Sequence, residues 1–165
     1  EQGTDYLDIV LLHCLTEPDW PRRYADAMDT LTRMKEAGLI RAVGVSCHNF
    51  GAFQYAAREP WVEVVLARIN YAGISMDAPP EQVVPVLDQM HGTGKGVYGM
   101  KVLGAGKSAH GLDPFGLGKL TRDPRKAIRY VLDLPSVHAI VIGMESEAEI
   151  DEDVNLVEEL TLVPA

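Results

Sequence analysis

The chain has 165 residues, of which 47% are hydrophobic and 24% are charged. This composition can bury one core and excludes the disordered and fibrous classes of protein. The 15 basic and 24 acidic side chains give a formal net charge of −9, which would repel phosphate backbones and anionic membrane surfaces. We therefore expect one soluble domain, residues 1–165, that binds neither nucleic acid nor membranes.

The cysteine content and the first residues bear on where the protein works. Cys14 and Cys47 are the only cysteines, which is too few for a disulfide framework and indicates a reducing cytoplasm. No apolar run approaches the roughly 20 residues that span a bilayer, and residues 1–5 lack the basic and apolar regions of a signal peptide. Because the chain starts without methionine and enters a strand almost at once, we expect it to be a piece of a longer protein.

Strand and helix patterns alternate through the first half of the chain. The expected elements are a strand at 7–12, a helix at 22–37, a strand at 42–46, a helix at 50–58 and a strand at 62–69. The first strands are apolar and β-branched along their length, which is typical of strands buried on both faces. In the first helix, apolar residues recur every three or four positions until Gly38 ends it.

The second half continues the same alternation. The expected elements are a helix capped by Asp77, a strand at 97–103, a helix at 123–134, a strand at 139–143 and a helix at 146–159. Pro80 fits the first turn of the helix after Asp77, but Pro85 is tolerable only if it lies close to the helix start. The Gly-rich stretch at 104–118 is long for a structureless loop, which predicts a functional role.

Strands that alternate with helices at this spacing predict a parallel sheet with crossover helices. Five strand–helix units fit either an open doubly wound sheet or most of a barrel, and periodicity alone does not choose between them. No G-x-G-x-x-G fingerprint follows the first strand, which disfavours the dinucleotide-binding version of the open sheet. The pattern therefore predicts an α/β protein and leaves both sheet types open.

Polar side chains stand at the carboxyl ends of two expected strands. His13 follows the strand at 7–12, and Ser46 closes the strand at 42–46. Parallel α/β folds place their active sites at this edge of the sheet, so we expect the two side chains to face a common pocket. The histidine could donate a hydrogen bond to a substrate oxygen, or each residue could have a purely structural role.

Four stretches of the sequence resemble the aldo-keto reductase family. Residues 4–13 and 34–46 carry the more specific part of the resemblance, and residues 101–106 and 141–153 follow in the expected order. The resemblance implies a (β/α)8 barrel of the TIM type, from its fourth strand to its eighth helix. Since a complete barrel takes about 250 residues, the barrel would be incomplete in this single domain, with about five strand–helix units and without its first three strands.

The resemblance also implies an activity. In this family a tyrosine acid, tuned by a lysine and an aspartate, and a histidine that orients the carbonyl reduce an aldehyde or ketone with hydride from a nicotinamide. The chain would thus be a fragment of an NAD(P)-dependent oxidoreductase with a small carbonyl compound as substrate. His13 matches the histidine, and the other three residues would precede Glu1. We therefore expect the isolated 165-residue chain to be inactive.

Two cofactor contacts that the resemblance implies lie after the second strand. Ser46 matches the residue that hydrogen-bonds the nicotinamide carboxamide. The family usually has asparagine next, whereas this chain has Cys47-His48-Asn49. Either Asn49 takes that role through a shifted loop, or the contact is lost.

Further implied contacts lie on the next two strands. The family's glutamine falls on Arg68, which cannot accept a hydrogen bond, and its nicotinamide-stacking tyrosine falls on Met100, unless Tyr98 stacks instead. Lys101 could contact the cofactor pyrophosphate or pair with an acid. Gly104 opens the Gly-rich loop, which could clamp the same pyrophosphate.

The last helix bears on the choice between NAD(H) and NADP(H). Ser146 and Glu149 form the pattern of a capping box, after Met144, which completes the implied cofactor contacts. Glu149 occupies the position where family members that prefer NADP(H) carry an arginine. Carboxylates at that helix start would repel a 2′-phosphate by a few tenths to about 1 kcal/mol each. The resemblance therefore predicts NAD(H) as the preferred cofactor.

A zinc site and a substrate contact are further candidates. His13-Cys14 and Cys47-His48 end neighbouring strands and offer the ligands of a tetrahedral zinc ion. Successive strand residues point to opposite faces, however, so we expect no metal site. Trp20 is the large aromatic residue that we nominate as a substrate contact.

Departures from the family pattern leave a second function open, that of a non-catalytic binding or regulatory module. The departures are Cys47, Arg68, Met100 and Glu149. An open piece of a barrel also presents unpaired strand edges, here at 7–12 and 139–143. We expect the isolated chain to associate with itself through these edges.

Overall fold

The computed structural model describes residues 3–104, 120, 123–144 and 146–162. Parallel strands form one 5-stranded sheet in the order β1-β2-β3-β4-β5. The strands are β1 (Leu7–Leu15), β2 (Ile40–Cys47), β3 (Val64–Arg68), β4 (Gly96–Met100) and β5 (Ala139–Ile140). The helices are α1 (Trp20–Arg23), α2 (Ala25–Glu36), α3 (Phe50–Arg58), α4 (Pro80–Gly92), α5 (Pro124–Leu132) and α6 (Glu147–Leu162).

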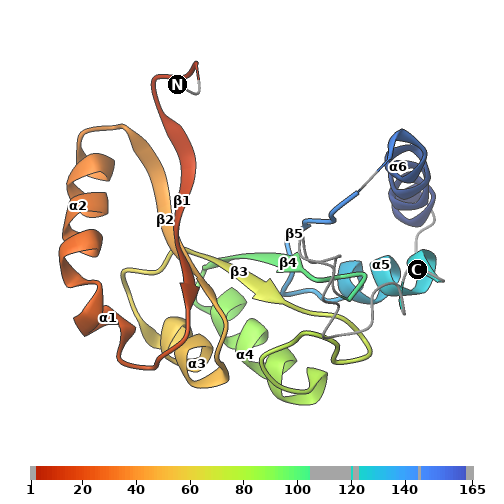
Figure 1. Ribbon diagram of the computed structural model, residues 1–165, viewed down its shortest axis with the longest axis horizontal. Helices are drawn as coiled ribbons and strands as arrows, with labels where there is room; N and C mark the ends of the chain where they lie inside the picture. The colour runs from red at the N-terminus through yellow and green to blue at the C-terminus, as the bar shows by residue number, and fades with distance from the viewer. Residues whose placement is uncertain (1–2, 105–119, 121–122, 145, 163–165) are drawn as a thin grey trace.

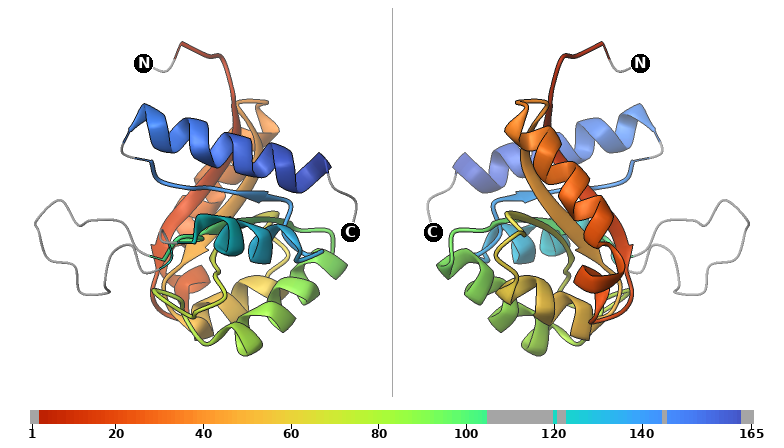
Figure 2. Two further views of the ribbon diagram at one scale, coloured as in Figure 1. Left: turned by 90° about the vertical axis from the view of Figure 1, so that its right-hand side faces the viewer. Right: turned by 90° about the vertical axis from the view of Figure 1, so that its left-hand side faces the viewer.

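The helices lie along the outer side of the curved sheet (Figure 1 and Figure 2). Figure 1 shows α3, α4 and α5 following the strands in turn, with α2 beside β1 and β2 and α6 at the far end. From β2 onward, each strand pairs in parallel with the strand that precedes it in the sequence. Sequential parallel pairing inside an arc of helices is the arrangement of a TIM-type barrel rather than of a doubly wound sheet. The prediction of an incomplete α/β barrel with five parallel strands is therefore confirmed.

The core lies between the outer face of the sheet and the helices. Along β3, Val65 and Ala67 are buried, whereas Leu66 and Arg68 are only partly buried. This alternation follows from the period of two in a strand. Helix residues of the same core cluster are Phe53 of α3, Val83 and Leu87 of α4, and Ile128 and Val131 of α5. The inner face of the sheet, which carries Leu66 and Arg68, is therefore the less covered one.

The close approach of β2 to its neighbours requires glycine at position 44. A Cβ atom there would lie 1.9 Å from the carbonyl oxygen of Val64 on β3 and 2.9 Å from a side-chain carbon of Leu11 on β1. Gly44 is paired with both residues in the sheet. Any side chain at this position would push the strands apart. Glycine at position 44 is therefore required by the packing of the sheet.

Several elements differ from the predicted boundaries. The helix expected at 22–37 is divided at Tyr24, whose φ of −109° and ψ of 21° separate α1 from α2. β1 runs on to Leu15 through a register shift after Leu12. The strand expected at 97–103 stops at Met100 because the next residue has a φ of +60°. β5 has two residues instead of the expected 139–143.

The start of α4 also corrects the sequence analysis. Pro79 occupies the N-cap position and Pro80 begins the helix, whereas Asp77 forms an ion pair with Arg68 instead of capping it. Pro85 lies inside the helix rather than near its start. It is exposed, so the backbone carbonyl that loses its helical partner lies on the solvent side.

Side-chain caps are present at the start of α5 and, as expected from the sequence, at the start of α6. The Asp123 side chain accepts a hydrogen bond from the backbone N–H of Lys126 at the start of α5. The Ser146 hydroxyl accepts one from the N–H of Glu149 at the start of α6. Both follow the pattern of a polar residue three positions before the donor. Among the described helices, none is long and apolar enough to cross a membrane.

Candidate active site

The carboxyl ends of β1 and β2 bring His13 and Ser46 into contact. Ser46 Oγ lies 3.1 Å from Nδ1 of His13. The two strands pair regularly up to Leu12 opposite Val45, after which the register shifts. The expected proximity of the imidazole and the hydroxyl group is therefore present, at the edge of the sheet where parallel α/β proteins carry their chemistry.

The backbone at Cys14 completes this contact. Cys14 has a φ of +60°, in the left-handed region that costs a non-glycine residue about 1–2 kcal/mol. In this conformation its N–H donates a hydrogen bond of 2.9 Å to Ser46 Oγ. Ser46 is 0% exposed, whereas His13 is exposed. The buried hydroxyl thus anchors an imidazole that faces the open side of the edge.

A second histidine stands beside the first. The ring centroids of His13 and His48 are 6.1 Å apart in an edge-on arrangement. Burial lowers the pKa of His48, and the nearby positive charge of Arg68 adds to this effect. His48 is therefore held in its neutral form at neutral pH. The sequence analysis considered His48 only as a zinc ligand.

The end of β3 carries a buried ion pair. The Arg68 guanidinium donates a hydrogen bond to the carboxylate of Asp77, and their side chains are only 16% and 4% exposed. Arg68 is paired with Met100 of β4 in the sheet, so the charge lies beside the position predicted to stack on a nicotinamide. The sequence analysis missed this pair because it assigned Asp77 to a helix cap. No local sequence pattern indicates that Arg68, at the end of a strand, pairs with Asp77, in the loop before a helix.

Asn70 organises the loop between β3 and α4. Its side-chain amide donates to the carbonyls of Ile74, at 2.7 Å, and Lys101, at 3.0 Å, while its oxygen accepts from the N–H groups of Ala72 and Ile74. All four hydrogen-bonding positions of the fully buried amide are thus used. The sequence analysis did not single out Asn70, although an asparagine directly after a strand and before Gly73 is a turn signal.

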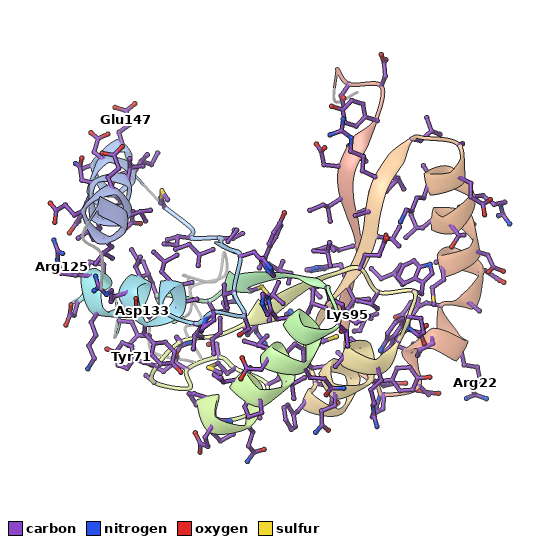
Figure 3. All side chains as sticks on the ribbon, turned by 180° about the vertical axis from the view of Figure 1, so that it is seen from behind. Arg22, Tyr71, Lys95, Arg125, Asp133 and Glu147 are labelled. Carbon is purple, nitrogen blue, oxygen red and sulfur yellow. The ribbon has the colours of Figure 1, made fainter. Side chains whose placement is uncertain are left out.

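The same loop is attached to α5 through Tyr71. Its ring lies edge-on to Tyr130 at a centroid distance of 6.2 Å, and Lys126 Nζ lies 4.4 Å from the ring centre. Figure 3 shows Tyr71 beside the α5 segment that ends near Asp133. The start of the loop is therefore held twice, by Asn70 to the residue after β4 and by Tyr71 to α5.

The predicted cofactor residues fall into two groups. The oxygens of Ser46 and Asn49 already serve the protein, since Asn49 Oδ1 accepts from the N–H of Ala52 as the N-cap of α3. Met100 and Lys101 lie half-buried at the end of β4. Gly104 is buried with a φ of +92°, which only glycine adopts readily.

The remaining predicted cofactor residues lie near α6, away from His13 along the chain. Met144 is 38% exposed, and Ser146 and Glu149 are exposed at the helix start. The Gly-rich stretch at 104–118, apart from Gly104, lies outside the described residues. The candidates available to hold a cofactor are therefore the end of β4 and the start of α6.

One predicted site residue, Trp20, is not supported as a substrate contact by the structure. Trp20 is 0% exposed and packs edge-on against Tyr55 of α3 at 6.0 Å, so its indole belongs to the core and not to a substrate pocket. No cluster of three or more metal-ligating side chains occurs within the described residues. Burial also raises the pKa of the Cys47 thiol to about 12, which disfavours the thiolate that zinc requires.

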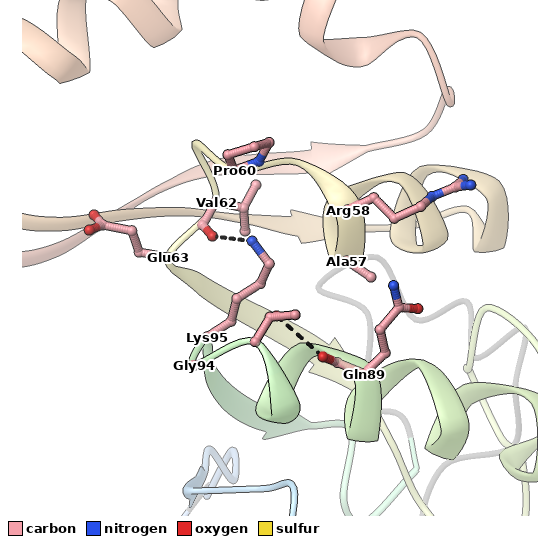
Figure 4. A pocket seen from close by; sticks show the side chains of 9 residues that line it. Ala57, Arg58, Pro60, Val62, Glu63, Gln89, Gly94 and Lys95 are labelled. Atoms are coloured by element: carbon pink, nitrogen blue, oxygen red, sulfur yellow. Dashed lines mark hydrogen bonds between the residues drawn. The ribbon is translucent and has the colours of Figure 1, made fainter.

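The opposite edge of the sheet contains a groove of different character (Figure 4). This groove of about 600 Å³ is lined by Arg58, Gln89 and Lys95, among others. Lys95 Nζ donates to the carbonyls of Glu59 and Val62 at 2.7 and 2.6 Å, so the cation serves backbone groups. In barrel folds this edge contributes to stability, and we assign the groove no ligand.

Sequence comparison connects this arrangement with one family. The model of the aldo/keto reductase family matches residues 1–112 of the chain. Among curated proteins, none matches the sequence.

Solved structures show the same fold. A Pseudomonas aeruginosa protein described as an aldo-keto reductase superposes with a TM-score of 0.69 at 22% identity, over 96% of this chain and 53% of its own. An aldo-keto reductase from Bacillus halodurans gives 0.68 at 19% identity, over 98% and 56% of the two chains. An aldose reductase from Giardia lamblia gives 0.65 at 17% identity, over 93% and 57%. The chain therefore spans little more than half the length of these proteins.

Proposed function

Because the chain belongs to the aldo/keto reductase family, we propose that it forms part of an NAD(P)-dependent oxidoreductase that reduces small aldehydes or ketones by hydride transfer. The observation that carries this proposal is the exposed His13 imidazole, held by Ser46 at the carboxyl edge of the barrel sheet. A hydrogen bond from this imidazole would orient a substrate carbonyl. The nicotinamide would supply the hydride.

The remaining catalytic groups belong, in this proposal, to the rest of the parent protein. A tyrosine would give the proton to the product oxygen, with a lysine beside it because a phenol is a poor acid at neutral pH. The 165-residue chain alone is then inactive. It would supply the orienting histidine and one side of the cofactor site.

The parent protein allows a direct test of this division of roles. His13→Gln should lower kcat/KM for aldehyde reduction about 100-fold or more, the usual effect of losing a group that assists proton transfer. His91→Gln is the matched control, since His91 is exposed at the end of α4, on the opposite side of the sheet. Equal activities of the two variants would refute the role of His13.

The cofactor would lie against the accessible part of the predicted set. Met100 can pack against a nicotinamide face, and the Lys101 ammonium can pair with a phosphate, since both lie half-buried at the end of β4. At the start of α6 the first turn carries Glu147 and Glu149, which would repel a 2′-phosphate. This acidic first turn supports NAD(H) as the cofactor.

Cofactor preference is tested by charge reversal in α6. Glu149→Arg in the parent protein should tighten NADPH binding several-fold relative to NADH, the factor that about 1 kcal/mol supports. Glu158→Arg, in the last turns of the same helix, makes the same charge change far from the helix start and should leave the ratio unchanged. Tighter binding of NADPH than of NADH by the unmodified protein would refute the preference.

A non-catalytic binding module is the second candidate function. It is favoured by Arg68, which stands at the position of the family's glutamine and forms an ion pair with Asp77. Unlike a glutamine side chain, a guanidinium cannot accept a hydrogen bond from a cofactor. The coding sequence upstream discriminates the two functions. A tyrosine four or five positions after an aspartate, with a lysine further on, supports the enzyme, and their absence supports the module.

Self-association of the isolated chain is a further part of the proposal. β1 and β5 stand at the two ends of the sheet, so each has one edge without a partner strand in the described part of the chain. Half-buried apolar residues such as Leu11 and Leu66 line its less covered face. Light scattering should show dimers or larger species, and a monodisperse monomer would refute the expectation.

A further inference from the structure

Ser46 occupies a buried position in which each of its hydrogen-bonding groups can be accounted for. Its oxygen accepts the N–H of Cys14 at 2.9 Å, a donor whose direction is fixed by the backbone. Its second contact is Nδ1 of His13, at 3.1 Å. Within the described segments, Ser46 Oγ makes no other hydrogen bond, and the residue is 0% exposed.

These contacts determine where the hydroxyl proton goes. If Nδ1 of His13 carried a proton and donated it to Ser46, the hydroxyl proton would remain buried without an acceptor. An unsatisfied buried donor costs about 1–3 kcal/mol. If the hydroxyl donates to Nδ1 instead, all the groups are satisfied. The second arrangement places the imidazole proton of neutral His13 on Nε2.

From this geometry we infer that Ser46 is a positioning residue, which donates its hydroxyl proton to Nδ1 of His13 and holds the imidazole in its Nε2–H tautomer. The inference rests on the proposed function only for its consequence, namely that Nε2 is ready to donate a hydrogen bond to a substrate carbonyl. It removes the Ser46 hydroxyl proton as a donor to the nicotinamide, because that proton is already engaged. Because the tautomer is already fixed, substrate binding need not spend free energy on shifting the tautomer equilibrium.

The strained backbone at Cys14 supports this assignment. A residue with a φ of +60° is maintained only when its surroundings compensate for the conformational cost. Here that conformation directs the Cys14 N–H at Ser46 Oγ, which occupies an oxygen lone pair and leaves the hydroxyl proton to the imidazole. The bulge of β1 and the hydroxyl of β2 thus act together on one ring.

The position of the proton can be measured on the 165-residue chain by NMR with labelled histidine, in alkaline buffer where imidazoles are neutral. His138 is an internal reference of known tautomer, because the Val97 N–H donates to its Nδ1 at 3.1 Å. We expect His13 to show the same signature, with the proton on Nε2. His13→Gln assigns the resonance. A proton on Nδ1 of His13 would overturn the inference, whether or not the parent protein is a reductase.

Substitution of the serine separates positioning from cofactor contact. Ser46→Ala should lower the ratio of the Nε2–H to the Nδ1–H tautomer of His13 about fivefold, because one net hydrogen bond of about 1 kcal/mol is lost. The tautomer of His138 should be unchanged. Ser46→Thr, which keeps a hydroxyl group, should retain the signature. If Ser46→Ala also alters the tautomer of His138, the substitution has changed the fold. The tautomer of His13 in the unmodified chain then decides whether the inference holds. The inference would be overturned if Ser46→Ala left the His13 tautomer unchanged. Weaker cofactor binding by the parent protein with the same substitution would then assign Ser46 to a nicotinamide contact.

Discussion

The two edges of the sheet differ in where the backbone is strained. Outside glycine, left-handed φ values in the described part of the chain occur at Cys14, Ser75 and Lys101. Cys14 lies in the last residues of β1, Ser75 in the loop after β3 and Lys101 directly after β4, so all three are on the carboxyl side of the sheet. At the opposite edge, the left-handed positions before β2 and β4 are glycines, Gly38 and Gly94. Glycine adopts this conformation at little cost, whereas other residues require compensation from their surroundings.

The amino edge is satisfied by ordinary structural contacts. Lys95 donates to two backbone carbonyls, and the Glu63 side chain accepts from Lys35 and from the Val43 N–H. His138 extends the pairing of β5 with β4, because its N–H donates to the Val97 carbonyl and its Nδ1 accepts from the Val97 N–H. Every polar group named here stabilises the end of a strand.

The comparison shows that backbone strain and stabilising contacts lie at opposite edges of the sheet. Strained residues at the carboxyl edge hold the groups we assign to chemistry, namely His13 through Cys14 and the Lys101 side chain itself. Retained strain of this kind is typical of functional sites. Substitutions at the two edges should therefore have opposite consequences for stability.

The largest expected effect tests the packing between the two edges. Gly44→Ala should lower the free energy of unfolding by about 3 kcal/mol, because its Cβ would meet the Val64 backbone 1.9 Å away. Gly92→Ala, where a Cβ meets nothing within 4 Å, should instead be neutral or stabilise α4 by about 0.5 kcal/mol. Urea denaturation measures both, and equal midpoints would show that β2 and β3 are not as close as described.

Identical substitutions at the two edges give the next largest effect. Lys95→Met leaves the carbonyls of Glu59 and Val62 without their donor, which should cost about 2 kcal/mol of unfolding free energy. Lys101→Met keeps the backbone strain and removes only a half-buried side chain, so its urea midpoint should match that of the unmodified chain. A larger loss at Lys101 than at Lys95 would reverse the comparison.

Relief of strain should produce a gain of stability. Lys101→Gly should raise the free energy of unfolding by about 1 kcal/mol, since glycine adopts a φ of +60° without the penalty of a side chain. The same substitution at Lys126, inside α5, should cost about 1 kcal/mol. Thermal denaturation of the two variants decides, and a loss of stability at Lys101 would show that this backbone is not strained.

The smallest expected effect appears only in acid. Burial raises the pKa of Glu63, but hydrogen bonds from Lys35 and the Val43 N–H outweigh it and bring the net pKa below its ordinary value. The unfolded chain therefore takes up the proton first as the pH falls, so the stabilisation is present above pH 4.5 and is lost below it. Glu63→Gln should flatten the dependence of stability on pH below 4.5.

The exposed carboxylate of Glu36 provides the control for the acid experiment. Glu36→Gln should leave the slope of stability against pH as in the unmodified chain. A slope that survives Glu63→Gln would assign the acid sensitivity to other carboxylates.

Local chemistry allowed much of the secondary structure to be predicted from the sequence. The helix at 50–58 has the expected bounds, and Ser146 caps its helix as expected. Such features depend on residues within one turn of each other, so they can be recognised without tertiary contacts. The parallel order of the strands follows in the same way from their alternation with helices.

Part of the site was equally accessible, and part was not. His13 and Ser46 were identified because residues at the carboxyl ends of neighbouring parallel strands meet at one edge. Trp20 was misassigned, since a large aromatic residue in a loop reads alike whether it faces a ligand or the core. Asp77 and Asn70 were missed as site residues. A local pattern assigned Asp77 to a helix cap, and nothing in the sequence shows that Asn70 bonds to Lys101, 31 positions away.

The sequence by itself determined the order of the elements, the N-cap of the last helix and the two strands that meet at His13 and Ser46. Only the tertiary structure decided the turn of the chain at Cys14, the partner of Arg68 and the burial of Trp20. The physical reason is the range of the interactions involved. Periodicity and capping act within a few residues, whereas the contact between Ser46 and Cys14 joins residues 32 positions apart and exists only once both strands are paired.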